Sequence, residues 1–363
     1  MIDRILLFPY TLTLALRNAW YRNGRHSVRA DVPTICVGNL TAGGTGKTPL
    51  TERILRILLD SDEWAYRNLA VLSRGYRRKS RGFQIVPRDG TARLYGDEPL
   101  QMAQKFPSVT VAVDKDRVEG CSLLTRPEGP AADVIILDDA YQYRRLKADL
   151  DIVLTDYSRP VHKDKLLPFG RLRDLPARLA DADMIVVSKC PTYLDEWEKG
   201  RWAAALGISG YSTSSCQGRS RTGKTQVLLF STLAYSPLEP VFPEGDARYV
   251  YAQRAILCTG IANDRPLRSY LSDTHKVVKA FHFPDHHRYT NGDIRSINGA
   301  SRSWPTALVV TTEKDARRIL DVKKVPSGLK ERLFQIPVET TFLTETEDAA
   351  FTATLLSALR KKQ

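Results

Sequence analysis

The sequence predicts an α/β protein with a mostly parallel sheet in its first domain and a second, smaller α/β domain after it. Short apolar runs rich in β-branched residues alternate with segments of helical pattern, the order expected when helices connect parallel strands. A glycine-rich loop separates the first such strand from the helix after it. With 363 residues, of which 42% are apolar, the chain has enough material for one large domain or two medium ones.

Residues 2–20 form the first predicted helix, and two interpretations of it stay open. Pro9 and several polar residues interrupt the apolar run, so it lacks the roughly 20 apolar residues of a membrane-spanning helix. It also lacks the basic-then-apolar order of a signal peptide. Its apolar side chains, with five arginines against one acid in residues 1–30, suit a helix lying on an anionic membrane surface. The alternative is a helix packed on the protein's own core.

The remaining elements follow in two sets. Strands of the first set are predicted at 33–37, 69–73, 109–113, 133–137, 152–155 and 184–188, with helices at 48–60, 99–105 and 117–125. The polar stretch 214–225 reads as an exposed connection. Strands of the second set are predicted at 255–259, 277–283, 307–311 and 333–338, with a closing helix at 348–362. We therefore expect a first domain at 1–222 and a second at 223–363.

The stretch TAGGTGKT at 41–48 is nearly a phosphate-binding loop. It departs from G-x-x-x-x-G-K-[ST] only in Thr41, and a predicted strand precedes it and a helix follows. Glycines let backbone N–H groups turn toward phosphate oxygens at the helix N-terminus. Lys47 is expected to reach the β- and γ-phosphates, and the Thr48 hydroxyl to bind Mg²⁺. The predicted nucleotide-binding residues are Thr41, Ala42, Gly43, Gly44, Thr45, Gly46, Lys47 and Thr48, with ATP and Mg²⁺ as cofactors. A second TGKT at 222–225 has no strand before it, and we interpret it as a coincidence.

Two further segments supply acidic and basic groups. The strand at 133–137 delivers Asp138 and Asp139, either of which can hold Mg²⁺ or simply cap the next helix. An acceptor hydroxyl loses its proton near the transition state, so a carboxylate or histidine is expected beside the γ-phosphate. Candidates lie in YGDEP (95–99) and HFPDHHRY (282–289). A surface loop with satisfied histidines is the alternative for the second segment.

The combination of motifs resembles the tetraacyldisaccharide 4′-kinase family of lipid A biosynthesis. The matching segments are VGNLTAGGTGKTP (37–49), LSRGYRR (72–78), YGDEPL (95–100), LDDAYQYRRL (137–146), LLPFGRLRD (166–174), GIAN (260–263), HFPDHHRY (282–289) and TTEKDA (311–316). The chain departs from the family where it reads LPFGRLRD for the usual LPAGPLRE, and where Tyr143 replaces a common histidine. Both departures fall on the acceptor side of the expected site.

The resemblance implies a reaction and roles for residues. The γ-phosphate of ATP would pass to the 4′-hydroxyl of a tetraacylated glucosamine disaccharide 1-phosphate, giving lipid IVA. Asp97 is then the base, His286 its partner and Lys47 the third catalytic residue. The resemblance also implies two α/β/α domains joined by a two-stranded linker, so that domain closure would bring His286 to Asp97. Positions expected near substrate or nucleotide are Asn39, Tyr76, Arg117, Gln142, Arg173 and Asp174.

The net charge of +13 predicts an anionic partner. The basic run at 74–81 is expected to meet the acceptor's 1-phosphate, lipid head groups or only solvent. No motif supports nucleic-acid binding, and no obligate protein partner is predicted. The five scattered cysteines form no C-x-x-C, which is typical of a reducing cytosol. Because the resemblance implies a tetraacyl substrate that lies in the membrane, we expect a peripheral protein on the cytoplasmic face of the bacterial inner membrane.

Two alternative functions are a nucleotide-switch ATPase or GTPase and a kinase for a soluble small molecule. Switch ATPases of the deviant type carry a lysine just before GG-x-GKT, where this chain has Ala42. GTPases read guanine with N/T-K-x-D after a late strand, where this chain has Lys189-Cys190-Pro191. Both absences count against a switch. The apolar N-terminal segment counts against a soluble acceptor.

Overall fold

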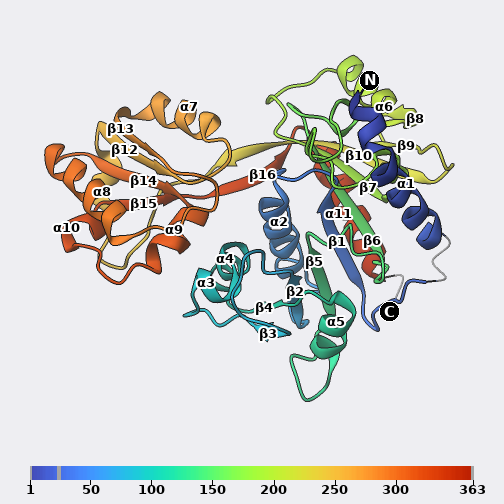
Figure 1. Cartoon of the computed structure of the whole chain (residues 1–363), viewed down its shortest axis with the longest axis horizontal. Helices are drawn as coiled ribbons and strands as arrows, with labels where there is room; N and C mark the ends of the chain where they lie inside the picture. Colours follow the sequence, from blue (N-terminus) through green and yellow to red (C-terminus); the bar gives the residue numbers. More distant parts are fainter. Residues whose placement is uncertain (1, 23–25, 361–363) are drawn as a thin grey trace.

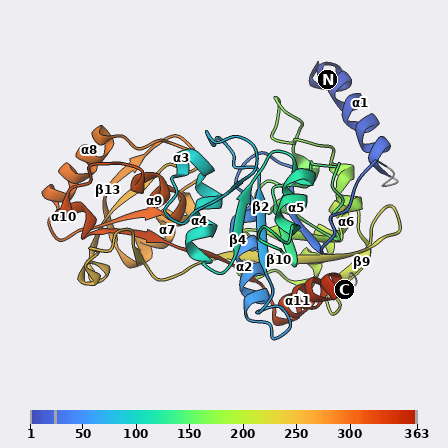
Figure 2. The ribbon, with the colours of Figure 1, turned by 90° about the horizontal axis from the view of Figure 1, so that it is seen from below.

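The computed structural model describes residues 2–22 and 26–360, with side chains described at 6–21 and 26–360. Two α/β units lie side by side and are joined by a long two-stranded ribbon (Figure 1). The larger unit carries the N-terminal helix α1 (Ile2–Arg22) at its end remote from the smaller unit (Figures 1 and 2). The predicted fold class is confirmed.

The larger sheet is mainly parallel, in the order β3-β4-β2-β5-β1-β6-β7-β10-β9-β8. Its strands are β1 (Thr34–Asn39), β2 (Leu69–Ser73), β3 (Gln84–Ile85), β4 (Thr110–Val113), β5 (Val134–Asp138), β6 (Leu150–Asp156), β7 (Met184–Ser188), β8 (Ser209–Ser212), β9 (Gln217–Arg219) and β10 (Thr225–Tyr235). Its central strand β1 pairs in parallel with β5 and β6, and all of its residues are buried, as expected for a strand covered on both faces. The stretch 214–225 is therefore no simple connection, because it contains β9 and enters β10.

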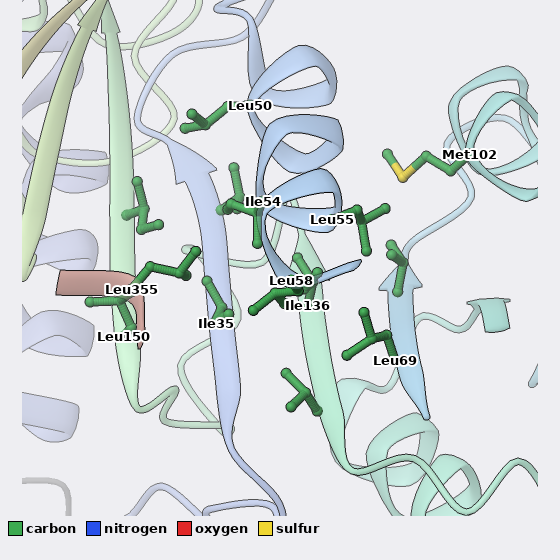
Figure 3. Close-up of a cluster of buried hydrophobic side chains, with 14 of the residues drawn as sticks. Ile35, Leu50, Ile54, Leu55, Leu58, Leu69, Met102, Ile136, Leu150 and Leu355 are labelled. Carbon is green, nitrogen blue, oxygen red and sulfur yellow. The ribbon is translucent and has the colours of Figure 1, made fainter. Parts of the chain in front are cut away.

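Helices cover both faces of this sheet. The segments between its strands are α2 (Lys47–Leu59), α3 (Ala92–Tyr95), α4 (Asp97–Lys105), α5 (Arg117–Thr125), α6 (Glu196–Leu206) and the short 3-10 turns η1 (Val161–Lys163) and η2 (Pro176–Asp181). On one face, α2 and α4 pack on the sheet through Leu50, Ile54 and Met102 (Figure 3). On the other face, α1, α5 and α6 cover a second apolar cluster.

The smaller unit holds a five-stranded sheet in the order β11-β15-β14-β12-β13. Its elements are β11 (Glu239–Pro240), η3 (Ala247–Tyr251), β12 (Arg254–Thr259), α7 (Arg265–Thr274), β13 (Lys276–His282), α8 (Asn291–Ser303), β14 (Leu308–Thr312), α9 (Glu313–Leu320), α10 (Ser327–Lys330) and β15 (Leu333–Ile336). Helix α7 packs on one face of the sheet, and α8, α9 and α10 on the other.

The ribbon between the units explains why the domain boundary differs from the expected division at 222/223. Strand β10 pairs with β7 at its start and with β16 (Val338–Phe342) at its end, so one strand belongs to both the sheet and the linker. The chain then returns to the larger unit as α11 (Glu345–Arg360). Phe351, Leu355 and Leu359 of α11 are buried in the same cluster as α2. The two-stranded linker is present, but residues 345–360 of the expected second domain pack in the first.

Replacing Phe351 with Ala should weaken the larger unit, because its ring is fully buried against α2 and the sheet. We expect the free energy of unfolding to fall by about 3–5 kcal/mol, the usual cost of deleting a buried phenylalanine side chain. Urea denaturation followed by circular dichroism measures this. The Ser357→Ala variant, on the exposed side of the same helix, is the control and should change stability by less than about 0.5 kcal/mol.

Candidate active site

The loop at 41–48 joins β1 to α2 in the geometry of a phosphate-binding loop. Gly43 and Gly46 have φ angles of 116° and 86°, which favour glycine. Thr41, in place of the usual glycine, forms a bridge with Leu172, and the Ala42 amide donates to the Arg171 carbonyl at 2.7 Å. Thr41 is absent from the residues with positive φ among those described, so its position requires no glycine. The first amides of α2 have no acceptor within the helix and point to where an anion binds.

Residues at the ends of neighbouring strands support this loop from behind. The Asn39 side-chain amide donates to the Thr45 hydroxyl at 2.7 Å, and the Ser188 hydroxyl donates to the Thr45 carbonyl at 2.7 Å. Lys189 donates to the Gly44 carbonyl and pairs with Asp156 at 2.6 Å. Sequence reasoning missed Ser188 and Lys189. Ser188 ends a fully buried strand and Lys189 follows it directly, and this position was the available signal.

The second TGKT is not a comparable loop. It lies in the hairpin between β9 and β10, where no helix follows it, and the Lys224 ammonium pairs with Asp183 at 2.7 Å.

Asp139 is held by two cations. The Lys47 ammonium lies 3.6 Å from one of its oxygens, and Arg173 binds both oxygens, at 2.7 and 3.0 Å. Arg173 also donates to the Asn39 side chain, and Gln142 donates to the Asn39 carbonyl. Burial acts to raise the pKa of Asp139, but Lys47 and Arg173 hold it well below its ordinary value. Four predicted residues, Asn39, Gln142, Arg173 and Asp139, therefore form one network with Lys47.

Asp138 is buried without such a cation. One of its oxygens accepts from the Ser73 hydroxyl at 3.1 Å, and the other, Oδ1, is buried with no hydrogen-bond partner among the residues that the structure describes. Burial, together with the charges of Glu98 and Asp139, raises the pKa of Asp138 to about 7 against the opposing charge of Lys47. An unpaired carboxylate oxygen at this place marks a position for a cation.

The other predicted substrate positions lie in three different settings. Arg117 is buried and donates to the Asp114 carbonyl at 2.7 Å, so it helps to hold the end of β4. Tyr76 is exposed, and its ring lies 5.3 Å from that of His286, centre to centre. Asp174 is fully buried beneath α1, where Asn18 donates to it at 2.8 Å and Arg17 at 3.0 Å. These contacts give Asp174 a structural role, and its substrate contact stays a prediction.

Asp97 begins α4 and faces the smaller unit. Arg318 of α9 donates to its Oδ2 from Nε at 3.0 Å and again from Nη2, and His286 Nδ1 lies 3.4 Å from the same oxygen. Burial acts to raise the pKa of Asp97, but the His286 hydrogen bond and the charges of Arg318 and Lys314 hold it well below its ordinary value. The expected pair of Asp97 and His286 is thus already in contact across the two units.

Helices α4 and α9 carry this contact between the units (Figure 2). Lys314 pairs with Glu98, Lys105 pairs with Glu313 at 2.8 Å, and Arg317 donates to Gln104 at 2.5 Å. Sequence reasoning missed Arg318, which stands just beyond the TTEKDA motif. Its spacing of four residues from Lys314, which puts both on one face of the helix, was the available signal.

The two halves of the site meet at one edge of the larger sheet. The loop follows β1, Asp138 and Asp139 end β5, and these strands are neighbours with parallel carboxyl ends. Glu98, next to Asp97, lies close enough to Asp138 to raise its pKa. Ligands of open parallel sheets bind at this edge.

Comparison with known proteins assigns the family. Residues 4–360 match the family model LpxK, tetraacyldisaccharide-1-P 4'-kinase. A tetraacyldisaccharide 4'-kinase of Parabacteroides distasonis is 39% identical over 327 residues, covering 88% of this chain and 84% of the relative. One of Phocaeicola vulgatus is 36% identical over 354 residues, covering 95% and 91%. The crystal structure of LpxK from Aquifex aeolicus, described as an "apo" form in complex with ATP, superposes with a TM-score of 0.69 at 25% identity, covering 98% of this chain and 99% of that one. On this geometry and these matches, the chain belongs to the tetraacyldisaccharide 4'-kinase family.

Proposed function

We propose that this protein transfers the γ-phosphate of ATP to the 4′-hydroxyl of a tetraacyldisaccharide 1-phosphate, forming lipid IVA. The observation that carries the proposal is the contact of buried Asp97 with His286 at the sheet edge where the phosphate loop and Lys47 lie. Relatives at 36–39% identity bear the name of this kinase, and the similar solved structure is in complex with ATP.

The residues divide the chemistry between them. The acceptor oxygen attacks the γ-phosphorus while the bond from that phosphorus to the bridging oxygen of ADP breaks, and the hydroxyl proton passes to the Asp97 carboxylate. Lys47, freed from Asp139 by the incoming phosphates, faces the charge that develops on the phosphoryl oxygens. Arg173 then remains to neutralise Asp139.

The site also fits Mg²⁺, which would neutralise charge on the β- and γ-phosphate oxygens. We assign the ion to Asp138 Oδ1, the buried oxygen without a partner, and to the Thr48 hydroxyl at the start of α2. Asp139 is the weaker candidate, because Lys47 and Arg173 already occupy its oxygens. Within the described side chains, no group of three or more His, Cys, Asp or Glu converges as a metal cage.

The membrane-facing surface of the proposed enzyme is α1. No helix in the described ranges is long and apolar enough to cross a bilayer. Leu14 and Asn18 of α1 are buried on the larger unit, while its other side leaves large apolar side chains exposed: Leu6, Phe8, Leu12, Leu16 and Trp20. Exposed apolar side chains on a protein with a net charge of +13 suit binding to an anionic leaflet that holds an acylated substrate. The cytoplasmic face of the inner membrane supplies both the anionic surface and the substrate.

A transfer assay with labelled ATP and the acylated disaccharide 1-phosphate tests the proposal. The unaltered protein should label the lipid, and Lys47→Met should lower the rate by about 10²–10³-fold because a stabiliser of transition-state charge is lost. Lys224→Met, in the second TGKT, is the matched control and should retain the rate within about twofold. ATP hydrolysis that is equal with and without lipid, and no labelled lipid, would favour a nucleotide switch instead.

The free energy of unfolding should depend on pH through the ionisation of Asp138. An ordinary aspartate has a pKa of about 4, whereas burial and neighbouring acids raise that of Asp138 to about 7. Its ionisation therefore destabilises the folded chain progressively as the pH rises from about 4 to about 7. Asp138→Asn should raise the free energy of unfolding at pH 8 by on the order of 2–4 kcal/mol, and by less at pH 5. Urea titrations without nucleotide measure this, with exposed Asp89→Asn as control; an equal effect at both pH values would contradict the assignment.

The exposed side of α1 should bind anionic vesicles. Leu16→Ser combined with Trp20→Ser removes two side chains that are 63% and 62% exposed, so we expect at least a tenfold fall in vesicle partitioning from the lost apolar burial of about 2 kcal/mol each. Flotation with phosphatidylglycerol vesicles measures it. Trp197→Ser on α6, 66% exposed, is the control and should bind as the unaltered protein does. Unchanged binding of the double variant would refute the assignment of this surface.

A further inference from the structure

We propose that Arg318 is a positioning residue for catalysis: it anchors Oδ2 of Asp97 and leaves Oδ1 to take the proton of the acceptor hydroxyl. The inference rests on the proposed kinase function and assigns a task to a residue of the smaller unit. Arg318 is buried. Four of its five N–H groups donate to Asp97, Asp315 and the Gly260 carbonyl, and the fifth faces His286 Nδ1.

The guanidinium is fixed from the smaller unit. Its Nη1 donates to the Gly260 carbonyl and to Asp315 Oδ1, both at 3.0 Å. Its Nε and Nη2 then reach across to Asp97 Oδ2. Because the guanidinium is planar, fixing Nη1 also fixes the direction in which Nε and Nη2 donate, which the flexible ammonium group of a lysine cannot do. The orientation of Asp97 in the larger unit is therefore set by Gly260, which directly follows β12, and by α9 of the smaller unit.

The two oxygens of Asp97 are consequently unequal. Oδ2 faces both Arg318 and His286, whereas Oδ1 accepts one hydrogen bond within the described chain, from the Glu98 amide at 3.2 Å. A carboxylate oxygen has room for a second hydrogen bond. Oδ1 is thus the oxygen that can receive a proton without breaking the anchor.

Arg318 also decides what His286 can do. Its Nη2 lies 3.2 Å from His286 Nδ1, and the same Nδ1 lies 3.4 Å from Asp97 Oδ2. One ring nitrogen cannot accept from Arg318 and donate to Asp97 at the same time. His286 therefore either carries its proton on Nδ1 and bonds Asp97, or carries it on Nε2 and bonds Arg318.

The charges around Asp97 make the proposal visible in a pH profile. The groups that face it are Arg318 and Lys314 from α9, His286 from the loop after β13, and Glu98 from its own helix. Without Arg318, burial of the carboxylate is less opposed, so its pKa rises. Protonated Asp97 cannot act as a base. As the pH is lowered, a variant without Arg318 should therefore lose activity at a higher pH than the unaltered protein does.

The test compares Arg318→Met with Arg317→Met in the lipid phosphorylation assay. Arg317 also bridges α4 and α9, through Gln104, but does not touch Asp97. For Arg318→Met we expect kcat to fall by about 10–100-fold, within the range of general-base effects. The pH midpoint of the acid limb in its pH–kcat profile should also move up by at least one pH unit. The KM for ATP should stay within about threefold. Arg317→Met should leave the limb in place.

Two further variants guard against a merely structural effect. Arg318→Lys keeps the positive charge but lacks the planar guanidinium group. It should therefore return the acid limb of the pH–kcat profile to its original pH but restore only part of kcat. In the Asp97→Asn background, Arg318→Met should cost much less than alone, because the two residues act as a unit. An unmoved acid limb in both Arg318 variants, or additive losses in the double variant, would overturn the inference. Failure of the unaltered protein to phosphorylate the lipid would instead overturn the proposed function.

Discussion

Three carboxylates at one edge of the sheet, buried Asp97 and Asp138 and half-buried Asp139, organise this structure through the way each is neutralised. Asp139 is paired with Lys47 and Arg173 from its own unit, and Asp97 with Arg318 from the other. Of these three acids, Asp138 alone has a buried oxygen without a hydrogen-bond partner in the described part of the chain. Burying an unpaired charge is costly unless a cation arrives, so the three acids are prepared for different tasks. In the proposed reaction Asp139 releases Lys47 to the phosphates, Asp97 is the base that Arg318 orients, and Asp138 can hold a metal ion.

The same charges explain why the enzyme has two units. A ribbon of β10 and β16 is a narrow connection, and by itself leaves the relative position of the two sheets loosely defined. The face between α4 and α9 adds ion pairs at both ends, Glu98 with Lys314 and Lys105 with Glu313. Because Asp97 and His286 already touch across this face, domain closure has little left to do in forming the pair. Movement between the units would instead separate Arg318 from Asp97, the proposed base, and so couple the hinge to the proposed reaction.

The sequence predicted what depends on local pattern. The strands at 69–73 and 184–188 were placed to the residue, because both are buried on two faces and read as unbroken apolar runs. The hairpin of β8 and β9 was not predicted, since its residues are mostly exposed and glycine-rich. In the site, the phosphate loop was found from spacing alone. Arg318 was not, because its partner Asp97 lies 221 positions earlier and no periodicity links the two.

Two adjacent residues connect the phosphate-loop site with helix α1, the proposed membrane-binding helix. Arg173 bonds Asp139 and Asn39 beside the phosphate loop, and Asp174 bonds Arg17 and Asn18 of α1. Because Arg173 and Asp174 are adjacent in the chain, this pair of residues connects the two sets of contacts. The Leu40 carbonyl accepts from the Arg173 amide at 2.7 Å, which fixes this segment to the strand that carries the loop. A helix resting on lipid would thereby hold the phosphate loop at a set depth, so that an acylated sugar reaches the γ-phosphate without leaving the leaflet.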